Sequence, residues 1–184
     1  QEELMSTQQE LLEKLGQVAE SRSKETGDHV KRVAEYSALM GKIYGLDYVE
    51  VQNLKVASPM HDVGKIAIPD HILNKPAKLT QEEFEIMKTH ALEGFKVFQG
   101  SDKALLRASA IIAHEHHERW DGKGYPNGLS GENIHIFGRI TALADVFDAL
   151  GSVRCYKKAW ELDDILKLIQ EESGKQFDPT LVTI

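Results

Sequence analysis

Two pairs of adjacent side chains give this sequence the means to bind two metal ions at once; they are His61-Asp62 and His116-His117. Each pair is expected at the end of a helix, where neighbouring side chains diverge by about 100° and can reach different ions from one point of the backbone. Three more suitable side chains are expected to point into a helical core: His29, His90 and Asp145. Glu25 precedes His29 by four residues, which places both on one helix face. Nitrogen and oxygen ligands without thiolate suit Fe, Mn, Ni or Zn, and helical bundles hold such ions in their cores.

Each of these residues also has an ordinary structural explanation. A lone inward histidine is more often a hydrogen-bonded core residue than a ligand, and Asp145 could pair with Arg139 or Arg154. Five imidazoles and three carboxylates on the inner faces of several helices are better explained by one metal cluster. The histidines expected to lie outside this cluster are His71, His114 and His135.

Basic side chains near the expected cluster suit an anionic substrate. Lys65 follows the first pair within a few residues, and Arg154 and Lys157 follow the helix that holds the last candidate carboxylate. Metal ions and basic side chains both stabilise charge that develops on phosphoryl oxygens, so we expect a phosphate ester as substrate. Residues 120–129 contain three glycines and a proline and are expected to form a structured loop. Within it, Tyr125 either presents a phenol to a ligand or packs the loop down.

The elements that must position these residues are helices. Their expected spans are 28–44, 47–61, 80–98, 103–118, 137–150, 163–173 and a last one from Asp178. Two of them begin with a capping box, formed by Asp47 with Glu50 and by Thr80 with Glu83. Residues 66–79 include two prolines and are expected to form a loop. No strand pattern of any length competes, so the predicted fold class is all-α.

The first segment, residues 1–20, reads as a connecting helix that precedes the body of the chain, residues 21–184. Its apolar residues, Leu4, Leu11, Leu15 and Val18, recur at spacings of seven, four and three. This narrow stripe favours either a short coiled coil, through which two copies would form a homodimer, or a helix docked on its own chain.

Composition excludes several classes of partner. The 184 residues carry a formal net charge of −7, which argues against a DNA or RNA polymer or an anionic membrane surface. No apolar run approaches the ~20 residues of a membrane span. The single cysteine, Cys155, excludes an internal disulfide and a thiolate zinc cage, and it favours a cytoplasmic location. The start at Gln1 without Met indicates a fragment of a longer protein.

Three motifs resemble those of the HD-GYP domain, a branch of the HD metal-dependent phosphohydrolases that hydrolyses cyclic di-GMP. They are His61-Asp-Val-Gly-Lys65, Pro69-Asp-His-Ile-Leu-Asn-Lys-Pro76 and His116-His-Glu-Arg-Trp-Asp-Gly-Lys-Gly-Tyr-Pro126. The similarity runs from about Glu25 to Phe177. It implies a five-helix HD core with extra helices and two or three divalent metal ions, commonly iron or manganese, with nickel or zinc as alternatives. It also implies a bacterial signalling protein with an upstream sensor or receiver domain.

The resemblance assigns roles to individual residues. The implied metal ligands are Glu25, His29, His61, Asp62, His90, His116, His117 and Asp145. Asp62 would bridge two ions, and Glu25 is the ligand found in members with three metals. Asp62 and Lys65 are the implied catalytic residues. The implied contacts to phosphate or guanine are Lys65, Tyr125, Asp148, Arg154 and Lys157. Small departures from the family pattern, such as Ala77 in place of glycine, concern substrate preference and not the metal site.

The function that the resemblance implies is a metal-dependent phosphodiesterase that opens cyclic di-GMP to pGpG and continues to GMP, through attack by a hydroxide held between two metals. Three alternatives stay open. A 3',3'-cyclic GMP-AMP phosphodiesterase would share the motifs. A diiron oxygenase of the HD type would share the ligands but would not explain the Gly-Tyr-Pro loop. A catalytically weak cyclic di-GMP receptor would usually have lost metal ligands, and this sequence keeps them all.

Overall fold

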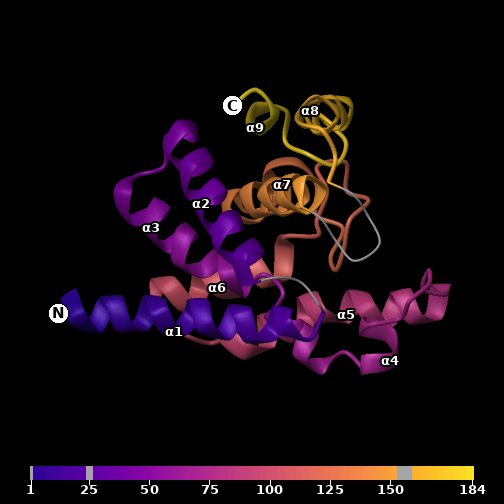
Figure 1. Cartoon of the computed structure of the whole chain (residues 1–184). Coiled ribbons are helices and arrows are strands. Elements are labelled where there is room, and N and C mark those ends of the chain that lie inside the picture. Colours follow the sequence, from indigo (N-terminus) through magenta and orange to yellow (C-terminus); the bar gives the residue numbers. More distant parts are fainter. Residues whose placement is uncertain (1, 24–26, 153–158) are drawn as a thin grey trace.

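Helices surround one central helix, α7, in the computed structural model, which describes residues 2–23, 27–152 and 159–184 (Figure 1). The α-helices are α1 (Glu2–Ser21), α2 (Gly27–Tyr44), α3 (Tyr48–Ala57), α4 (Asp70–Leu73), α5 (Gln81–Phe98), α6 (Ala104–Glu115), α7 (Ile136–Gly151), α8 (Leu162–Glu171) and α9 (Pro179–Val182). The short 3₁₀ helices are η1 (Ser58–Met60), η2 (Val63–Ala67) and η3 (Gly131–Asn133). These ranges contain no β-strand, which confirms the predicted all-α class. Within them, no helix is both long and apolar enough to span a lipid bilayer.

The helices begin where side chains satisfy their first backbone N–H groups. The Asp47 carboxylate accepts from the N–H of Glu50 at 2.8 Å, and the Glu50 carboxylate accepts from the N–H of Asp47 at 2.9 Å. Thr80 and Glu83 form the same reciprocal pair at the start of α5. The Asp178 side chain caps α9 by accepting from the N–H of Thr180. Because the first turn of a helix has no internal partner for these N–H groups, such caps determine where each helix starts, and both predicted capping boxes are confirmed.

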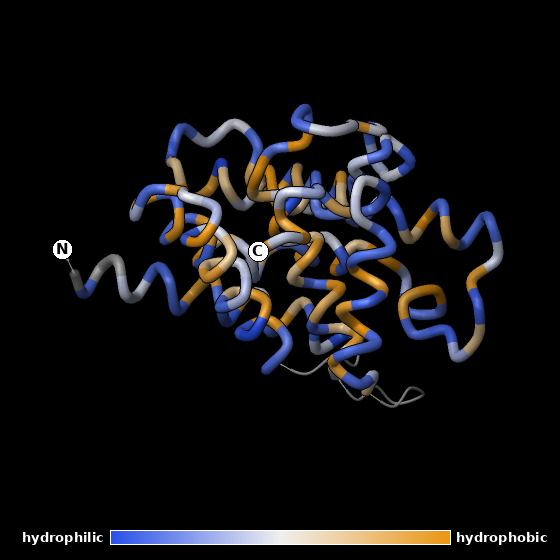
Figure 2. Tube along the Cα trace, turned by 90° about the horizontal axis from the view of Figure 1, so that it is seen from above, coloured by the Kyte–Doolittle hydropathy of each residue, from blue (hydrophilic) through white to orange (hydrophobic). Residues whose placement is uncertain are grey.

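The central helix α7 carries much of the core. Its side chains Phe137, Ile140 and Leu143 are at most 7% exposed and pack in one cluster with Leu54 of α3 and Ile112 of α6. Burying one such side chain contributes about 1.5–3 kcal/mol. Figure 2 shows apolar residues alternating with hydrophilic ones along the helices, as expected where each helix buries one face. This packing fixes α7 against α2, where the site described below is built.

The first helix, α1, lies along the base of the molecule in Figure 1, and its N-terminal end projects beyond the other helices in Figures 1 and 2. It packs against α2, η1 and η2 and buries Leu12 and Ala19. The predicted apolar stripe faces outward instead, since Leu11, Leu15 and Val18 are between 51% and 60% exposed. The helix is therefore docked on its own chain while a stripe stays available for a partner. The predicted domain boundary at residue 20 stays a prediction.

Two predicted helices end at least three residues early, and one predicted loop contains a helix. The helix expected over 47–61 ends at Ala57, because Pro59 has no N–H to continue the ladder, and η1 follows. The helix expected over 103–118 ends at Glu115. The loop expected over 66–79 contains the short helix α4. As a result, the pair His61-Asp62 lies between two 3₁₀ helices instead of at the end of a long α-helix.

Candidate metal centre

Asp62 lies at the middle of the predicted ligands and is only 5% exposed. Its Oδ1 atom lies 3.2 Å from Nε2 of His90 and 3.4 Å from Nε2 of His116. Its Oδ2 atom lies 3.1 Å from Nε2 of His61 and 2.8 Å from Nζ of Lys65. One carboxylate thus presents one oxygen to the imidazoles of His90 and His116 and the other to the imidazole of His61. This is the arrangement expected of a ligand that bridges two ions.

Two groups of donor atoms surround this carboxylate. One group is Asp62, His90, His116 and His117, and the other is His29, His61 and Asp145; the donor atoms within each lie within 4.8 Å of one another. Nitrogen and oxygen ligands bind metals such as zinc at about 2.0–2.2 Å, so ligands on opposite sides of one ion are about 4.0–4.4 Å apart. Each group is therefore close to the size of a single coordination sphere. The structure brings together seven of the eight predicted ligands; the eighth, Glu25, lies outside the described residues.

The hydrogen bonds of the buried rings show which nitrogen faces the centre. His61, His90 and His116 each direct Nδ1 to a backbone carbonyl, and a carbonyl oxygen can only accept. The three acceptors are Ser58 at 2.8 Å, Met87 at 2.7 Å and Ile112 at 3.0 Å, respectively. In its neutral form each ring therefore has its lone pair on Nε2, and these three Nε2 atoms form no hydrogen bond with any described residue. Three buried lone pairs that converge on one carboxylate fit a metal centre and would be costly without one.

His29 is oriented by a carboxylate instead. Its Nδ1 lies 2.6 Å from Oδ2 of Asp148, and its Nε2 lies 3.2 Å from Oδ1 of Asp145. Asp148 is 3% exposed and is held in turn by Arg32, whose Nε donates to Oδ1 at 2.6 Å. A carboxylate behind a ligand histidine fixes the ring and makes it a better donor. The predicted contact of Asp148 with guanine stays a prediction.

Electrostatics favour a cation at this site. Burial disfavours a charged imidazolium, but hydrogen bonds with Asp145 and Asp148 raise the pKa of His29 to about 9. Burial also disfavours the charged form of His61, but Asp62, Asp145 and Glu20 together raise its pKa to about 10. Burial lowers the pKa of His117, which favours a neutral ring with a free lone pair. The carboxylates therefore provide negative charge that a bound divalent ion would neutralise.

Gly64 allows the two chain segments that carry Asp62 and His90 to meet. A Cβ atom on Gly64 would lie 1.9 Å from the carbonyl oxygen of His90, far inside contact distance. The 3₁₀ helix η2 therefore crosses α5 at a separation that a larger residue would not permit. This crossing brings the Asp62 carboxylate within 3.2 Å of the His90 ring.

The loop over 120–129 packs over the second pair of histidines. The Tyr125 ring stacks on the His117 ring with centroids 4.8 Å apart and an interplanar angle of 23°. The loop is held from beneath by the buried Glu118 carboxylate, which accepts from the N–H groups of Asn127 at 2.7 Å and Leu129 at 3.0 Å. Tyr125 thus lies at the edge of the centre. The loop is held in place by the hydrogen bonds to Glu118 as well as by the Tyr125 ring.

The three histidines predicted to lie outside the cluster belong to neither ligand group. His114 stacks on Phe95 with centroids 4.5 Å apart and belongs to neither ligand group. His71 and His135 are exposed, and His135 also caps α7. Asp145 does not pair with Arg139, which lies 2.6 Å from Asp178. The predicted substrate contacts Arg154 and Lys157 lie outside the described residues.

Sequence reasoning missed three charged residues that contact the site or its supports. Glu20 of α1 is fully buried, with its carboxylate near His61. Arg32 supports Asp148, and Glu118 supports the loop. Arg32 lies three residues after His29, on the same helix, and this spacing is a signal that was available. For Glu20 and Glu118 no spacing points to the contact, because it depends on how separate segments pack.

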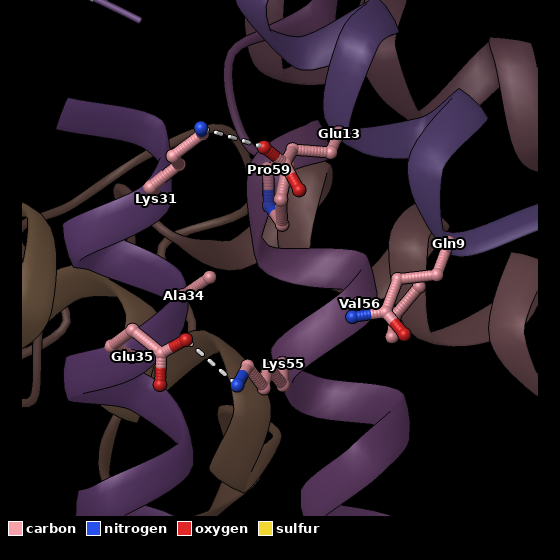
Figure 3. Close-up of a pocket in the computed structure, with 8 residues that line it drawn as sticks. All are labelled: Gln9, Glu13, Lys31, Ala34, Glu35, Lys55, Val56 and Pro59. Carbon is pink, nitrogen blue, oxygen red and sulfur yellow. Dashed lines mark ion pairs between the residues drawn. The ribbon is translucent and has the colours of Figure 1, made fainter. Parts of the chain in front are cut away.

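A pocket of about 200 Å³ lies away from the metal centre, between α1, α2 and α3 (Figure 3). Figure 3 shows two ion pairs that link neighbouring helices there, Lys31 with Glu13 at 3.5 Å and Lys55 with Glu35 at 2.7 Å. No histidine lines it, and its charged groups are paired with one another. We therefore assign it a structural role.

Comparison with known proteins gives consistent matches. The family model described as HD domain matches residues 13–181. The 3'3'-cGAMP-specific phosphodiesterase 2 of Vibrio cholerae is 47% identical over 182 residues, which cover 99% of this chain and 35% of that protein. The cyclic di-GMP phosphodiesterase response regulator RpfG of Xanthomonas campestris is 43% identical over 180 residues, covering 98% of this chain and 48% of the relative. A cyclic di-GMP phosphodiesterase of Thermotoga maritima is 46% identical over 173 residues, covering 94% and 47%.

Solved structures agree on the fold. The crystal structure of a cyclic GMP-AMP specific phosphodiesterase of V. cholerae matches with a TM-score of 0.70 at 23% identity, covering 95% of this chain and 47% of that chain. The chain thus spans between 35% and 48% of the length of these curated relatives.

Proposed function

The chain belongs to the HD-GYP branch of the HD domain family, and from this premise we propose that it is a metal-dependent phosphodiesterase that hydrolyses cyclic di-GMP to pGpG and then to GMP. The observation that carries the proposal is the Asp62 carboxylate, because one of its oxygens faces the buried nitrogens of His90 and His116 and the other faces that of His61. Two ions held about one carboxylate are a common device for hydrolysing phosphate esters.

HD domain phosphohydrolases depend on metals, and the residues present suit them. We propose iron or manganese, with nickel or zinc as alternatives, held by the two ligand groups and, at a third position, by Glu25. When bound, such ions polarise phosphoryl oxygens and lower the pKa of water. Asp62 would be a ligand of both ions, and the three rings would be held as ligands by the hydrogen bonds of their Nδ1 atoms to backbone carbonyls.

Basic residues supply the remaining charge stabilisation. The Lys65 ammonium lies 2.8 Å from Asp62, and its side chain is 15% exposed, so it is placed at the edge of the centre. There it can donate to a phosphoryl oxygen as negative charge develops. We propose that Tyr125, next to His117, contacts the nucleotide, and that Arg154 and Lys157, which follow α7 in the sequence, bind phosphate or guanine. Asp148 is proposed to contribute both to orienting His29 and to the base-binding region.

The second candidate substrate is 3',3'-cyclic GMP-AMP, because relatives of both specificities match nearly the whole chain. One experiment tests the function and separates the substrates. The protein is purified anaerobically, its metals are measured, and each cyclic dinucleotide is incubated with it before product chromatography. The proposal predicts metal in at least two equivalents and release of pGpG from cyclic di-GMP. Stoichiometric metal without turnover of either nucleotide would favour the receptor alternative.

We also propose a cytoplasmic location, an upstream sensor or receiver domain, and a homodimer formed through α1. The dimer is supported by the outward stripe on that helix, where Leu11, Leu15 and Val18 are more than half exposed. Sedimentation of the wild-type chain and of a Leu11→Glu, Leu15→Glu variant tests it. A wild type that remains monomeric at high concentration would contradict the dimer.

A further inference from the structure

Glu20 is a buried carboxylate beside the metal centre that lies outside the family ligand set. It sits near the C-terminal end of α1 and is 0% exposed. Its Oε1 atom lies 4.0 Å from Nε2 of His61 and 3.9 Å from Nζ of Lys65. Glutamate is rarely this buried unless it is paired or binds a metal. The function of the carboxylate must therefore be sought among the groups that it faces.

The end of α1 is tied to the segment that carries the HD pair. Arg22, just after the helix, donates to the carbonyl oxygens of Lys65 at 3.2 Å and of Ile68 at 3.1 Å, and pairs with Asp70 at 2.7 Å. In addition, the Ser23 hydroxyl donates to Oε2 of Glu20 at 3.2 Å. These contacts hold η2 against the end of α1. They leave Oε1 of Glu20 directed toward the centre.

The donor atoms of Glu20, His61 and Asp62 all lie within 4.8 Å of one another, and all three side chains are buried. His61 also belongs to the group that contains His29 and Asp145. Because its Nδ1 donates to a carbonyl, the ring has one lone pair and can bind only one ion. The two groups that share His61 therefore describe one ion, not two.

We propose that Glu20 is an additional protein ligand of the ion bound by His61, acting through Oε1 on the side of that ion near Oδ2 of Asp62. This inference rests on the proposed metal centre. It increases the difference between the two ions, because the ion on the His61 side would gain a second anionic oxygen, beside that of Asp145, that the ion held by His90, His116 and His117 lacks. Hard, oxygen-preferring cations would be favoured at the His61 position.

The competing explanation is that Glu20 only neutralises Lys65. The test uses Co²⁺ as the metal, added to the full chain stripped of metal. Titration with Co²⁺ measures affinity and stoichiometry, and the visible bands of bound Co²⁺ report the number and type of its ligands. The variants are Glu20→Gln, which keeps the shape and removes the charge, and Glu20→Asp, which keeps the charge and withdraws the oxygen. Glu13→Gln, on the same helix and away from the centre, is the matched control.

We expect Glu20→Gln to weaken one class of Co²⁺ site by at least about 10-fold and to change its visible bands, whereas Glu13→Gln changes neither. The effect should persist when Lys65 is also replaced by methionine, because a ligand does not act through the lysine. Wild-type affinity and bands in Glu20→Gln, or loss of the effect in the Lys65→Met background, would overturn the inference while leaving the metal centre intact. If Glu20→Gln fails to fold, the visible bands of Co²⁺ bound to Glu20→Asp decide between the two explanations. Changed bands would support a ligand role, and wild-type bands would show that Glu20 only neutralises Lys65. A wild-type chain that binds no Co²⁺ would overturn the proposed metal centre and this inference together.

Discussion

Replacing Gly64 with alanine should disrupt both the fold and the metal centre, because the glycine lies where η2 crosses α5. The added Cβ would lie 1.9 Å from the His90 carbonyl oxygen and 2.5 Å from the backbone nitrogen of Gly94. A carbon and a carbonyl oxygen approach one another to about 3.3 Å, so the two segments would have to separate by about 1.4 Å. Both contacts are with backbone atoms, and no rotamer change can relieve them.

The size of the effect follows from this displacement. Overpacking a well-packed interior costs about 1–3 kcal/mol, and we expect the upper end here because backbone has to move. For a chain of this size, about 3 kcal/mol lowers Tm by roughly 6–12 °C. The same shift would move Asp62 away from His90, whose facing atoms are 3.2 Å apart. Metal ligands tolerate about 0.2 Å of error, so the ion on the His90 side should be lost.

Thermal unfolding in EDTA and in excess Mn²⁺ measures both effects in one assay. The loss of stability appears in EDTA, and the loss of metal binding appears as a smaller rise of Tm on adding Mn²⁺. Gly151→Ala is the control, because among the described residues its Cβ would meet only Ile165 Cδ1, at an ordinary 3.6 Å. A Gly64→Ala variant with the wild-type Tm and the wild-type response to Mn²⁺ would refute this account of the crossing.

Three other experiments separate metal binding from chemistry. Asp62→Ala should lose metal and activity together, by at least about 100-fold in metal affinity, because one carboxylate serves both ions; metal analysis showing full occupancy would contradict the bridging role. Alanine at Lys65, Arg154 or Lys157 should leave metal content near wild type and lower kcat/KM by about 100-fold; loss of metal in all three would indicate a structural ion-pair network instead. Glu25→Ala should bind two metals in place of three and accumulate pGpG, which chromatography of the products would detect, and unchanged GMP formation would rule out the three-metal proposal.

Much of the fold could be predicted because its signals are local. The capping boxes at Asp47 and Thr80 are read from residues three apart, and both helices start where they indicate. The end of α3 was predicted four residues too late. Pro59 could have indicated it, because proline has no N–H to donate to the helix. The short helix α4 was missed because a turn of four residues between two prolines has no periodicity to detect.

The ligand set could be predicted from residue type and motif, but its charge balance could not. The pairs His61-Asp62 and His116-His117 are visible in sequence because each unites two ligand types in adjacent positions. Glu20 lies nine residues before His29, among other polar residues of an amphipathic helix, and nothing local distinguishes it from the exposed Glu10. Its burial depends on the docking of α1 against η2. Arg22 stabilises this docking through hydrogen bonds to residues more than forty positions later in the sequence.

The orientation of the ligand rings follows from where each histidine lies in its element. His90 lies inside α5, and His61 and His116 lie at the ends of helical turns, so each has carbonyl oxygens three or four residues earlier within reach of Nδ1. His29 is the third residue of α2, so it lies in the first turn of its helix. Its Nδ1 lies 2.6 Å from a carboxylate of another helix, Asp148 of α7, which orients the ring as the backbone carbonyls orient the other three. Orienting His29 with a carboxylate in place of a carbonyl places a negative charge in the interior, and Arg32 balances it by donating Nε to Oδ1 of Asp148.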